Sequence, residues 1–373
     1  MRAGRRRFLA GLGVASAGAL ARPALAQSAP EVSWKMTSSF QPALDLIFDG
    51  AKLFAKALAE LTDGKFTIAL APAGEIAPAL EALDAVNDGR AECAHTALHY
   101  FWGKDPSFVF GSSTPFGMNA RQHGAWLGQG GGGELIDALL ADYKAFGVAA
   151  GNTGGQMAGW FRKEIRSPGD FKGLKVRIGG FAGKVMQNMG AEPTTIPKEG
   201  VYGALESGAL DVFEWAGPYD DERFGERKDG PKQVVAKVAP YYYYPGWWKG
   251  GMQLHFVVAS EKFAALPKAY QAAFRAAATL ADASIQQKYD AANPAALKRL
   301  VVAGAELRLF PQDVMEACYK AANDLYMQLG AENPAFKKLA DSYFAFRSDE
   351  YLWWQVAEYS FDNFMIRQRR AKG

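Results

Sequence analysis

Two charged side chains stand at the ends of apolar segments, where a sheet would present them to a ligand. Arg177 comes near the end of the alternating segment 173–178, one residue before two glycines. A guanidinium there can hold a carboxylate through two parallel hydrogen bonds, although an ordinary exposed arginine is the alternative. Glu214 lies in the otherwise apolar segment 210–215, and a buried carboxylate is unstable unless it meets a cation. The pair predicts a site for a small organic anion.

Gln156 adds a neutral oxygen to this pair. It follows the glycine-rich segment 151–155, whose glycines allow the backbone to turn tightly beside a ligand. An anionic ligand could bridge Arg177 and a cation, with Glu214 and Gln156 supplying oxygens to that cation. Sodium and calcium prefer carboxylate, amide and carbonyl oxygens. The spacing is equally compatible with a salt bridge between Glu214 and an arginine, such as Arg177 itself.

The elements that would position these residues follow an α/β pattern. At 373 residues and 49% hydrophobic content, the chain is long enough for two lobes with separate cores. Alternating apolar segments predict strands, and apolar residues at helical spacing predict helices between them. The predicted strands are 32–37, 66–70, 91–97, 145–150, 173–178, 192–196, 210–215 and 251–259, and the predicted helices are 44–61, 79–87, 134–143, 181–189 and 198–207. Everything beyond residue 260 is predicted to be helical.

This order predicts a two-lobed fold like that of periplasmic binding proteins, with mainly parallel sheets flanked by helices. Lobe I would comprise residues 31–152 and 243–285, and lobe II residues 153–242 and 286–340. A ligand cleft would lie between the lobes, because ligands of open α/β sheets bind beyond the carboxyl ends of the strands. The loops expected to converge on it follow Thr37, Ala97, Ala150, Arg177 and Phe213.

The C-terminal segment 341–373 is predicted to form a long helix. Its aromatic and aliphatic residues cover most of the helix circumference. Such a helix needs more cover than one lobe provides, so it would either pack across both lobes or join two copies of the chain.

The N-terminus has the pattern of an export signal. Residues 5–9 (RRRFL) form a twin-arginine motif, residues 10–20 a short apolar run, and residues 24–26 a small-residue cleavage site. The run is too short for a transmembrane helix. We therefore predict a signal peptide at 1–26 and a mature protein in the periplasm.

Charge and metal-ligand counts exclude other classes. The signal holds five arginines and no acid, so its removal lowers the formal net charge from +3 to −2 and leaves no basic surface for nucleic acid or a membrane. Four histidines with no His/Cys pair at ligand spacing argue against a zinc or iron site. Cys93 and Cys318 are expected to be buried free thiols.

Three segments carry a resemblance to a known family. They are 166–177 (RSPGDFKGLKVR), 89–92 (GRAE) and 206–211 (ESGALD). The sequence resembles the periplasmic solute receptors of TRAP (tripartite ATP-independent periplasmic) transporters over nearly all of the mature chain. The resemblance implies that Arg177 clamps the ligand carboxylate and that the partner is a TRAP membrane permease.

Within that family the sequence is most similar to the branch that binds 2-oxo or 2-hydroxy monocarboxylates, such as pyruvate or lactate, with a metal ion. The pattern of that branch has a glutamine in the glycine loop and a Glu-Trp pair at the later strand end. Gln156 and Glu214-Trp215 match it. The resemblance implies a homodimer joined by the C-terminal helix. It also implies that sodium or calcium bridges ligand and protein through Gln156, Glu214 and the carbonyl of Trp215. Further implied contacts are Asn152, Tyr100 and Phe101 for the ligand and Gln253 for the metal, the last being equally compatible with a strand surface residue.

We expect a receptor rather than an enzyme. The sequence has no G-x-S-x-G elbow, no H-E-x-x-H motif and no dinucleotide fingerprint after the first strand. Two alternatives remain: an exported enzyme acting on oxo acids, and a receptor for a larger sugar acid or polyol. A small, aromatic-lined, metal-bearing pocket suits a short acid better than a bulky sugar acid.

Overall fold

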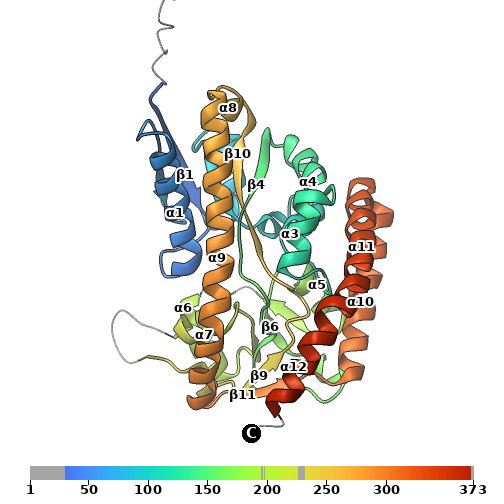
Figure 1. Cartoon of the computed structure of the whole chain (residues 1–373). Coiled ribbons are helices and arrows are strands. Elements are labelled where there is room, and N and C mark those ends of the chain that lie inside the picture. Colours follow the sequence, from blue (N-terminus) through green and yellow to red (C-terminus); the bar gives the residue numbers. More distant parts are fainter. Residues whose placement is uncertain (1–29, 195, 197, 226–231, 371–373) are drawn as a thin grey trace, which may run out of the picture.

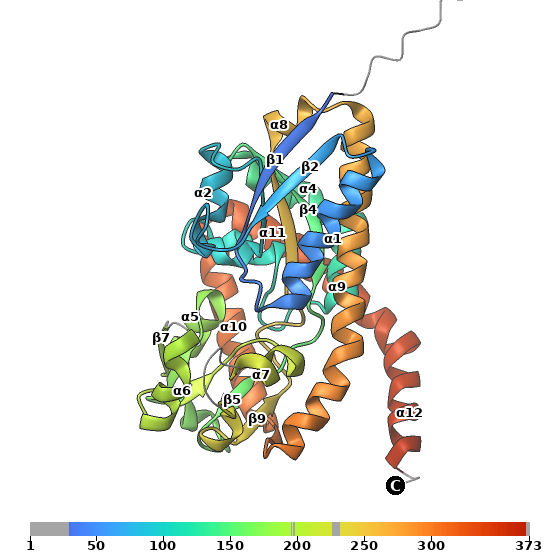
Figure 2. The same cartoon turned by 90° about the vertical axis from the view of Figure 1, so that its left-hand side faces the viewer.

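The computed structural model describes residues 30–370 except 195, 197 and 226–231, so the predicted signal peptide 1–26 lies outside the described residues. The described strands form two sheets, one in each half of the molecule, and the long helix α9 (Lys268–Val302) runs beside both (Figures 1 and 2). This arrangement confirms the predicted two-lobed α/β fold.

The first sheet has five strands in the order β2-β1-β3-β10-β4, and only β10 runs against the others. Alternate residues of β1, such as Trp34 and Met36, point to one face, where α1 and α9 cover them. Helices α2 and α4 cover the other face. The elements are β1 (Val32–Ser38), β2 (Phe66–Ala71), β3 (Cys93–Thr96), β4 (Ala145–Asn152), β10 (Gln253–Ala259), α1 (Asp45–Leu61), α2 (Ala82–Asn87), α3 (Ala120–Gln129), α4 (Gly132–Ala141) and α8 (Ser260–Ala264).

The second sheet has six strands in the order β11-β9-β5-β8-β6-β7, and only β5 runs against its neighbours. Trp160, Phe213 and Tyr242 fill one face, and Phe161 and Val176 lie in the core on the other. The elements are β5 (Gly159–Phe161), β6 (Lys175–Arg177), β7 (Glu192–Thr194), β8 (Val212–Phe213), β9 (Tyr241–Tyr244), β11 (Glu306–Leu309), α5 (Gly180–Asn188), α6 (Lys198–Ser207), α7 (Pro218–Phe224) and α10 (Gln312–Glu332).

Residues 153–158 between β4 and β5, residues 245–252 between β9 and β10, and α9 itself all connect the lobes. The helix after α10 returns to the first lobe as well, where it packs against α3 and α4. Helix α9 contributes Ile285 to the core of the first lobe and Leu300 to that of the second. The second connection contributes Lys249 and Met252 to the cleft, and the first lies next to a cleft residue through the bond from Met157 N to Ala216 O.

Two details differ from the sequence-based expectations. Residues beyond 260 are not all helical, because β11 adds an edge strand beside β9. The polar/apolar alternation of β11 covers only four residues, three of them exposed, which is too short a pattern to distinguish a strand from a helix. Tyr243 and Tyr244, placed in lobe I by the predicted boundary, pair within the second sheet.

The C-terminal helix begins earlier than predicted and is interrupted. It comprises α11 (Pro334–Trp354), a π-helical turn (Gln355–Tyr359) and α12 (Ser360–Arg370). Figure 2 shows α12 projecting away from both lobes. The end of α11, the π-helical turn and α12 expose large apolar side chains, namely Tyr351, Leu352, Trp353, Val356, Tyr359, Phe361, Phe364, Met365 and Ile366.

Two smaller expectations can also be checked. Cys93 and Cys318 are buried and free, as predicted. Over the described ranges, no helix combines the length and apolar character needed to cross a bilayer.

Candidate functional site

A cleft of about 810 Å³ lies between the lobes. Its first-lobe wall comes from the loop after β1 and from the short helix that follows β3. Its second-lobe wall comes from the ends of β6 and β8 and from the start of α5, and Lys249 of the second connection completes it. Of the five loops predicted to converge on the cleft, those after Thr37, Ala97, Arg177 and Phe213 line it, whereas the loop after Ala150, which carries Gln156, does not.

Arg177 ends β6 and lines the cleft. Its Nε donates to the carbonyl oxygen of Ile196 at 3.2 Å, and its Nη1 donates to that of Glu214, also at 3.2 Å. The guanidinium carbon lies 5.3 Å from the ring centre of Trp215 and 5.8 Å from that of Phe213. Two bonds and two rings fix the plane of the guanidinium in the cleft wall.

Glu214 is paired, but its partner is not an arginine. The residue is only 5% exposed, and its Oε1 accepts a hydrogen bond from Lys249 Nζ at 2.7 Å. The alternative of a salt bridge with Arg177 is thus wrong, since Arg177 contacts the backbone carbonyl of Glu214 and the carboxylate pairs with Lys249. Burial explains why a partner is needed.

Gln156 carries an unused oxygen. The residue is 7% exposed, and its Nε2 donates to Thr153 Oγ1 at 2.9 Å. Its Oε1 is buried and accepts no hydrogen bond from any residue that the structure describes. A buried amide oxygen without a donor costs about 1–3 kcal/mol, so this oxygen is free to contact a group that arrives from outside.

Backbone packing brings the glutamine segment close to the carboxylate. Met157 N donates to Ala216 O at 3.2 Å, which places Gln156 beside the Glu214-Trp215 segment. Gly159 has φ of +104°, and a Cβ there would lie 2.4 Å from the carbonyl oxygen of Phe213. Only glycine allows this approach.

Asp221 fixes the same segment from behind. It accepts hydrogen bonds from Ala216 N, Trp160 Nε1 and Tyr242 Oη at 3.1, 3.1 and 2.7 Å. Three donors on one buried carboxylate hold the residues after Glu214 in a single position.

The first-lobe wall brings aromatic side chains to the same place. Burial and the nearby Glu214 carboxylate raise the pKa of Tyr100 to about 12, so its hydroxyl stays protonated beside Arg177 and Glu214. The Trp102 ring packs edge-on against Phe181 of α5, with ring centres 5.5 Å apart. This contact crosses the cleft.

Phe101 does not line the cleft, contrary to the prediction. It is 1% exposed and packs edge-on against Phe108 in the main core. The short helix after β3 turns Tyr100 and Trp102 toward the cleft and Phe101 away from it. Adjacent aromatics in a sequence give no signal of which ring faces inward.

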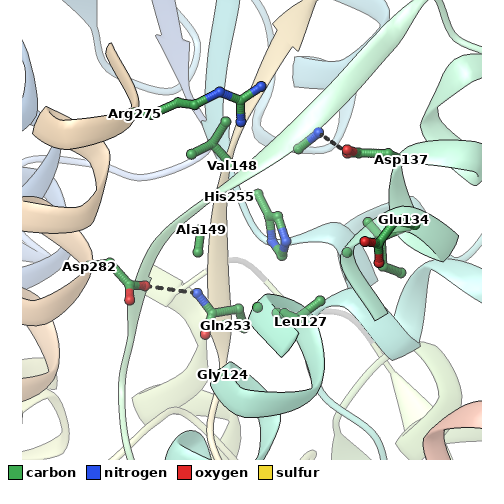
Figure 3. A pocket seen from close by; sticks show the side chains of 14 residues that line it. Gly124, Leu127, Glu134, Asp137, Val148, Ala149, Gln253, His255, Arg275 and Asp282 are labelled. Atoms are coloured by element: carbon green, nitrogen blue, oxygen red, sulfur yellow. Dashed lines mark hydrogen bonds between the residues drawn. The ribbon is translucent and has the colours of Figure 1, made fainter. Parts of the chain in front are cut away.

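Asn152 and Gln253 lie behind the cleft wall. Asn152 Nδ2 donates to Gln253 Oε1 at 3.1 Å, and its Oδ1 accepts from Gly154 N at 2.9 Å. Gln253 Nε2 also donates to Asp282 Oδ1 at 3.0 Å. Gln253 lines a second cavity of about 430 Å³ instead, where Figure 3 shows it beside Asp282. Its amide groups are thus engaged with protein.

Two cleft residues, Lys249 and His99, could not be predicted from the sequence. Lys249 follows a pair of tryptophans in the second connection, and nothing in that stretch distinguishes it from a surface lysine. His99 Nδ1 lies 2.9 Å from Ser112 Oγ, and Ser112 Oγ itself donates a hydrogen bond to the carbonyl oxygen of Gln253 at 2.8 Å. His99 Nδ1 must therefore carry the proton. Burial and the Lys249 charge lower the pKa of His99 to about 3, so the ring is neutral.

One set of contacts joins the lobes beside the cleft. Asp45, at the start of α1, accepts hydrogen bonds at its Oδ2 from Arg223 Nη1 at 2.6 Å and from Tyr219 Oη at 2.9 Å. Both partners lie on α7 in the second lobe. The ion pair therefore links the two lobes directly.

The donor set fits a hard cation. Gln156 supplies an amide oxygen that has no partner in the described part of the chain, and Glu214 supplies a buried carboxylate. Oxygens of these kinds suit sodium or calcium, whereas zinc and iron prefer nitrogen and sulfur. Among the described residues, no group of three or more His, Cys, Asp or Glu side chains could hold a metal ion, so such a cation would need backbone or ligand oxygens as well.

Fold and cleft together define a two-lobed solute-binding protein. The chain belongs to the bacterial extracellular solute-binding proteins of family 7, the DctP family, whose model matches residues 37–333. Members of this family serve as periplasmic receptors of TRAP transporters and are not enzymes. The resemblance seen in the sequence is thereby confirmed.

Three proteins show how similar the relatives are. A monocarboxylate 2-oxoacid-binding periplasmic protein of Nostoc sp. is 42% identical over 335 residues, which cover 90% of this chain and 89% of that protein. A TRAP receptor of Bordetella bronchiseptica, crystallised as a mixed-occupancy dimer with calcium and picolinate, is 41% identical with a TM-score of 0.86, covering 92% and 100% of the two chains. One from Pseudoalteromonas atlantica, with sodium and pyruvate, is 34% identical with a TM-score of 0.83, covering 89% and 99%.

Proposed function

We propose that this protein binds a 2-oxo or 2-hydroxy monocarboxylate together with sodium or calcium and delivers it to a TRAP permease. The observation that carries the proposal is the placement of Arg177 and Glu214 on one wall of the cleft, with the unpaired oxygen of Gln156 nearby. The ligands of the Nostoc, Bordetella and Pseudoalteromonas relatives support the choice of acid and metal.

Each residue has a definite role in this proposal. Arg177 pairs with the ligand carboxylate, and its two backbone bonds keep the guanidinium from following a loosely placed anion. Gln156, Glu214 and the Trp215 carbonyl hold the cation. When bound, the cation supplies positive charge to the ligand carboxylate and α-oxygen. A ligand with few atoms needs such charge-assisted contacts to bind tightly.

The remaining predicted residues support the site at different distances. Tyr100 offers a protonated hydroxyl next to Arg177 and Glu214, and the Trp215 ring limits the space for the ligand tail. Asn152 and Gln253 act indirectly, because their bonds hold the glycine loop that carries Gln156. Phe101 contributes to the core that supports the wall.

Three cellular properties complete the proposal. The signal 1–26 directs export by the twin-arginine pathway. The exposed apolar surface of α12 joins two copies in a homodimer, since a helix with so many exposed aromatics needs cover. The protein retains its ligand without turning it over, and it presents the ligand to the membrane subunits.

Thermal stabilisation tests this function. Metal-free protein should gain melting temperature when pyruvate and calcium are added together, because a ligand that binds only the folded state stabilises it. A panel that includes lactate, a sugar acid and a polyol separates the alternatives. Stabilisation by the sugar acid alone would transfer the assignment to that class, and conversion of pyruvate to product would make the protein an enzyme.

A further inference from the structure

The ion pair between Lys249 and Glu214 occupies the carboxylate that the proposed function assigns to the metal. Its two atoms lie 2.7 Å apart, and both side chains are largely buried, at 14% and 6% exposure. A lysine ammonium is a compact point charge, comparable in this respect to a small monovalent cation. Glu214 is therefore already neutralised before a metal arrives.

The chain places Lys249 firmly. A Cβ on Gly250 would lie 2.4 Å from the carbonyl oxygen of Met118, and one on Gly251 would lie 2.4 Å from Asn152 Oδ1. Both glycines let the second connection pass close to the first lobe. The ammonium reaches Glu214 from a packed segment rather than from a free surface loop.

Among the described residues, the charges lining the cleft balance without any ligand, since Arg177 and Lys249 are positive and Glu214 and Asp220 are negative. Tyr289 Oη donates to Asp220 at 2.7 Å, which keeps that carboxylate at the back of the site. A metal alone would add uncompensated positive charge to the cleft, and an acid anion alone would add negative charge. When both bind, their charges largely cancel, and the net charge added to the cleft is much smaller.

We propose that Lys249 is a tethered cation that holds Glu214 in the empty receptor and competes with the metal for it. The metal then binds weakly by itself and tightly once the acid anion is present. This inference rests on the proposed function, because it concerns the metal of that same site. Lys249 acts here as a specificity-determining residue that prevents the receptor from filling with metal alone.

The unprotonated Nε2 of His99 is consistent with this exchange. His99 keeps its proton on Nδ1, so Nε2 has a lone pair, and the nearby Lys249 charge already contributes to lowering its pKa. His99 and Lys249 both line the cleft, so this lone pair is a candidate acceptor for the ammonium when Glu214 turns to a metal.

The test is calorimetric titration of calcium into the metal-free, full mature chain, first without acid and then with saturating pyruvate. Lys249→Gln removes the competing charge, and Lys249→Arg keeps it. Lys320→Gln is the matched control, because Lys320 pairs with Asp324 on the exposed side of α10. Melting curves of all variants confirm that each is folded.

Lys249→Gln should bind calcium without acid roughly tenfold or more tightly than the parent protein, since a neighbouring positive charge is gone. Pyruvate should then raise its calcium affinity by a smaller factor than in the parent. Lys249→Arg and Lys320→Gln should behave as the parent does. Calcium affinity in Lys249→Gln that is equal to or below that of the parent would overturn the inference.

The two proposals fail differently. If the parent protein binds no calcium even with pyruvate, the metal site of the proposed function is wrong. If the parent binds calcium with pyruvate, Glu214→Gln loses that binding and Lys249→Gln shows no gain without acid, then only the competition by Lys249 is wrong.

Discussion

Arg177 Nη1 donates to the backbone carbonyl of Glu214 at 3.2 Å, while the side chain of Glu214 turns away to Lys249. The two residues lie 37 positions apart in sequence and meet because β6 and β8 are parallel neighbours. The backbone bond orients the guanidinium without neutralising it. Its positive charge therefore stays available to an anion in the cleft.

Arg177→Lys tests the need for a guanidinium. Lysine keeps the charge but cannot make both the backbone bonds and a two-point contact with a carboxylate. Pyruvate affinity should fall roughly 10- to 100-fold, the loss expected for one or two charge-assisted hydrogen bonds. Calorimetry in the presence of calcium measures it. Unchanged affinity would mean that the carboxylate binds elsewhere.

Gln156→Met tests the unpaired oxygen. The change removes a buried acceptor that lacks a donor and also removes the bond to Thr153, so the two effects on the free energy of unfolding largely offset each other. The free protein should melt within a few degrees of the parent. Calcium-dependent stabilisation by pyruvate should disappear. A large loss of stability with retained binding would show that the oxygen has a structural role instead.

The Asp45 contacts test how the lobes are held together. Asp45→Asn weakens the ion pair to Arg223 and the bond from Tyr219 but leaves every cleft residue in place. Pyruvate should dissociate several-fold faster, because the lobes separate more easily. Stopped-flow tryptophan fluorescence measures this rate. Asp49→Asn, on the exposed side of the same helix, is the control. Equal dissociation rates would show that these contacts do not limit opening.

Buried histidines predict the response to acid. Burial lowers the pKa of His95 to about 3, of His255 to about 3 and of His123 to about 4. The unfolded chain binds protons near its ordinary pKa of about 6.5, so between these values the unfolded state holds more protons than the native state. Stability should therefore be full above about pH 6.5 and fall as the pH drops toward 4.

Urea unfolding at several pH values measures this slope. His123→Gln keeps a donor for the carbonyl of Phe110, which His123 Nε2 contacts at 2.8 Å, but it cannot be protonated. Its slope should be shallower by up to one proton, about 1.4 kcal/mol per pH unit. Parallel slopes for the parent and this variant would contradict the assignment of His123 as a buried neutral base.

The C-terminal helix predicts a dimer. Phe361 and Phe364 are 62% and 51% exposed on α12, which is too apolar a surface for a lone helix in water. The double change of both to glutamate should convert a dimer to a monomer while pyruvate binding stays intact. Light scattering after size exclusion decides it. A parent protein that is already monomeric would remove the proposal.

Sequence reasoning found the fold and the second-lobe wall of the cleft, because those features are local. Arg177 at a strand end before glycines, and Glu214 in an apolar strand, are visible as patterns. The glycine loop likewise marked Gln156, whose unpaired oxygen only the structure reveals. These positions needed no knowledge of distant contacts.

Other features depend on packing between distant segments and left no local trace. Lys249 meets Glu214 across 35 residues of chain, and its own neighbours give no hint of burial. Phe101 turned inward because the short helix after β3 gives adjacent residues different directions. Gln253 bonds to Asn152 because the two residues lie opposite each other on the paired strands β10 and β4. The position of each of these three residues depends on tertiary contacts, which the periodicity of the sequence does not reveal.

A crystal structure with pyruvate and calcium, using the anomalous signal of calcium, tests the central claim most directly. The calcium peak should lie beside Gln156 Oε1 and the Glu214 carboxylate, with the pyruvate carboxylate on Arg177. A calcium peak away from these oxygens, or pyruvate density in the second cavity beside Gln253 and Asp282, would contradict the account.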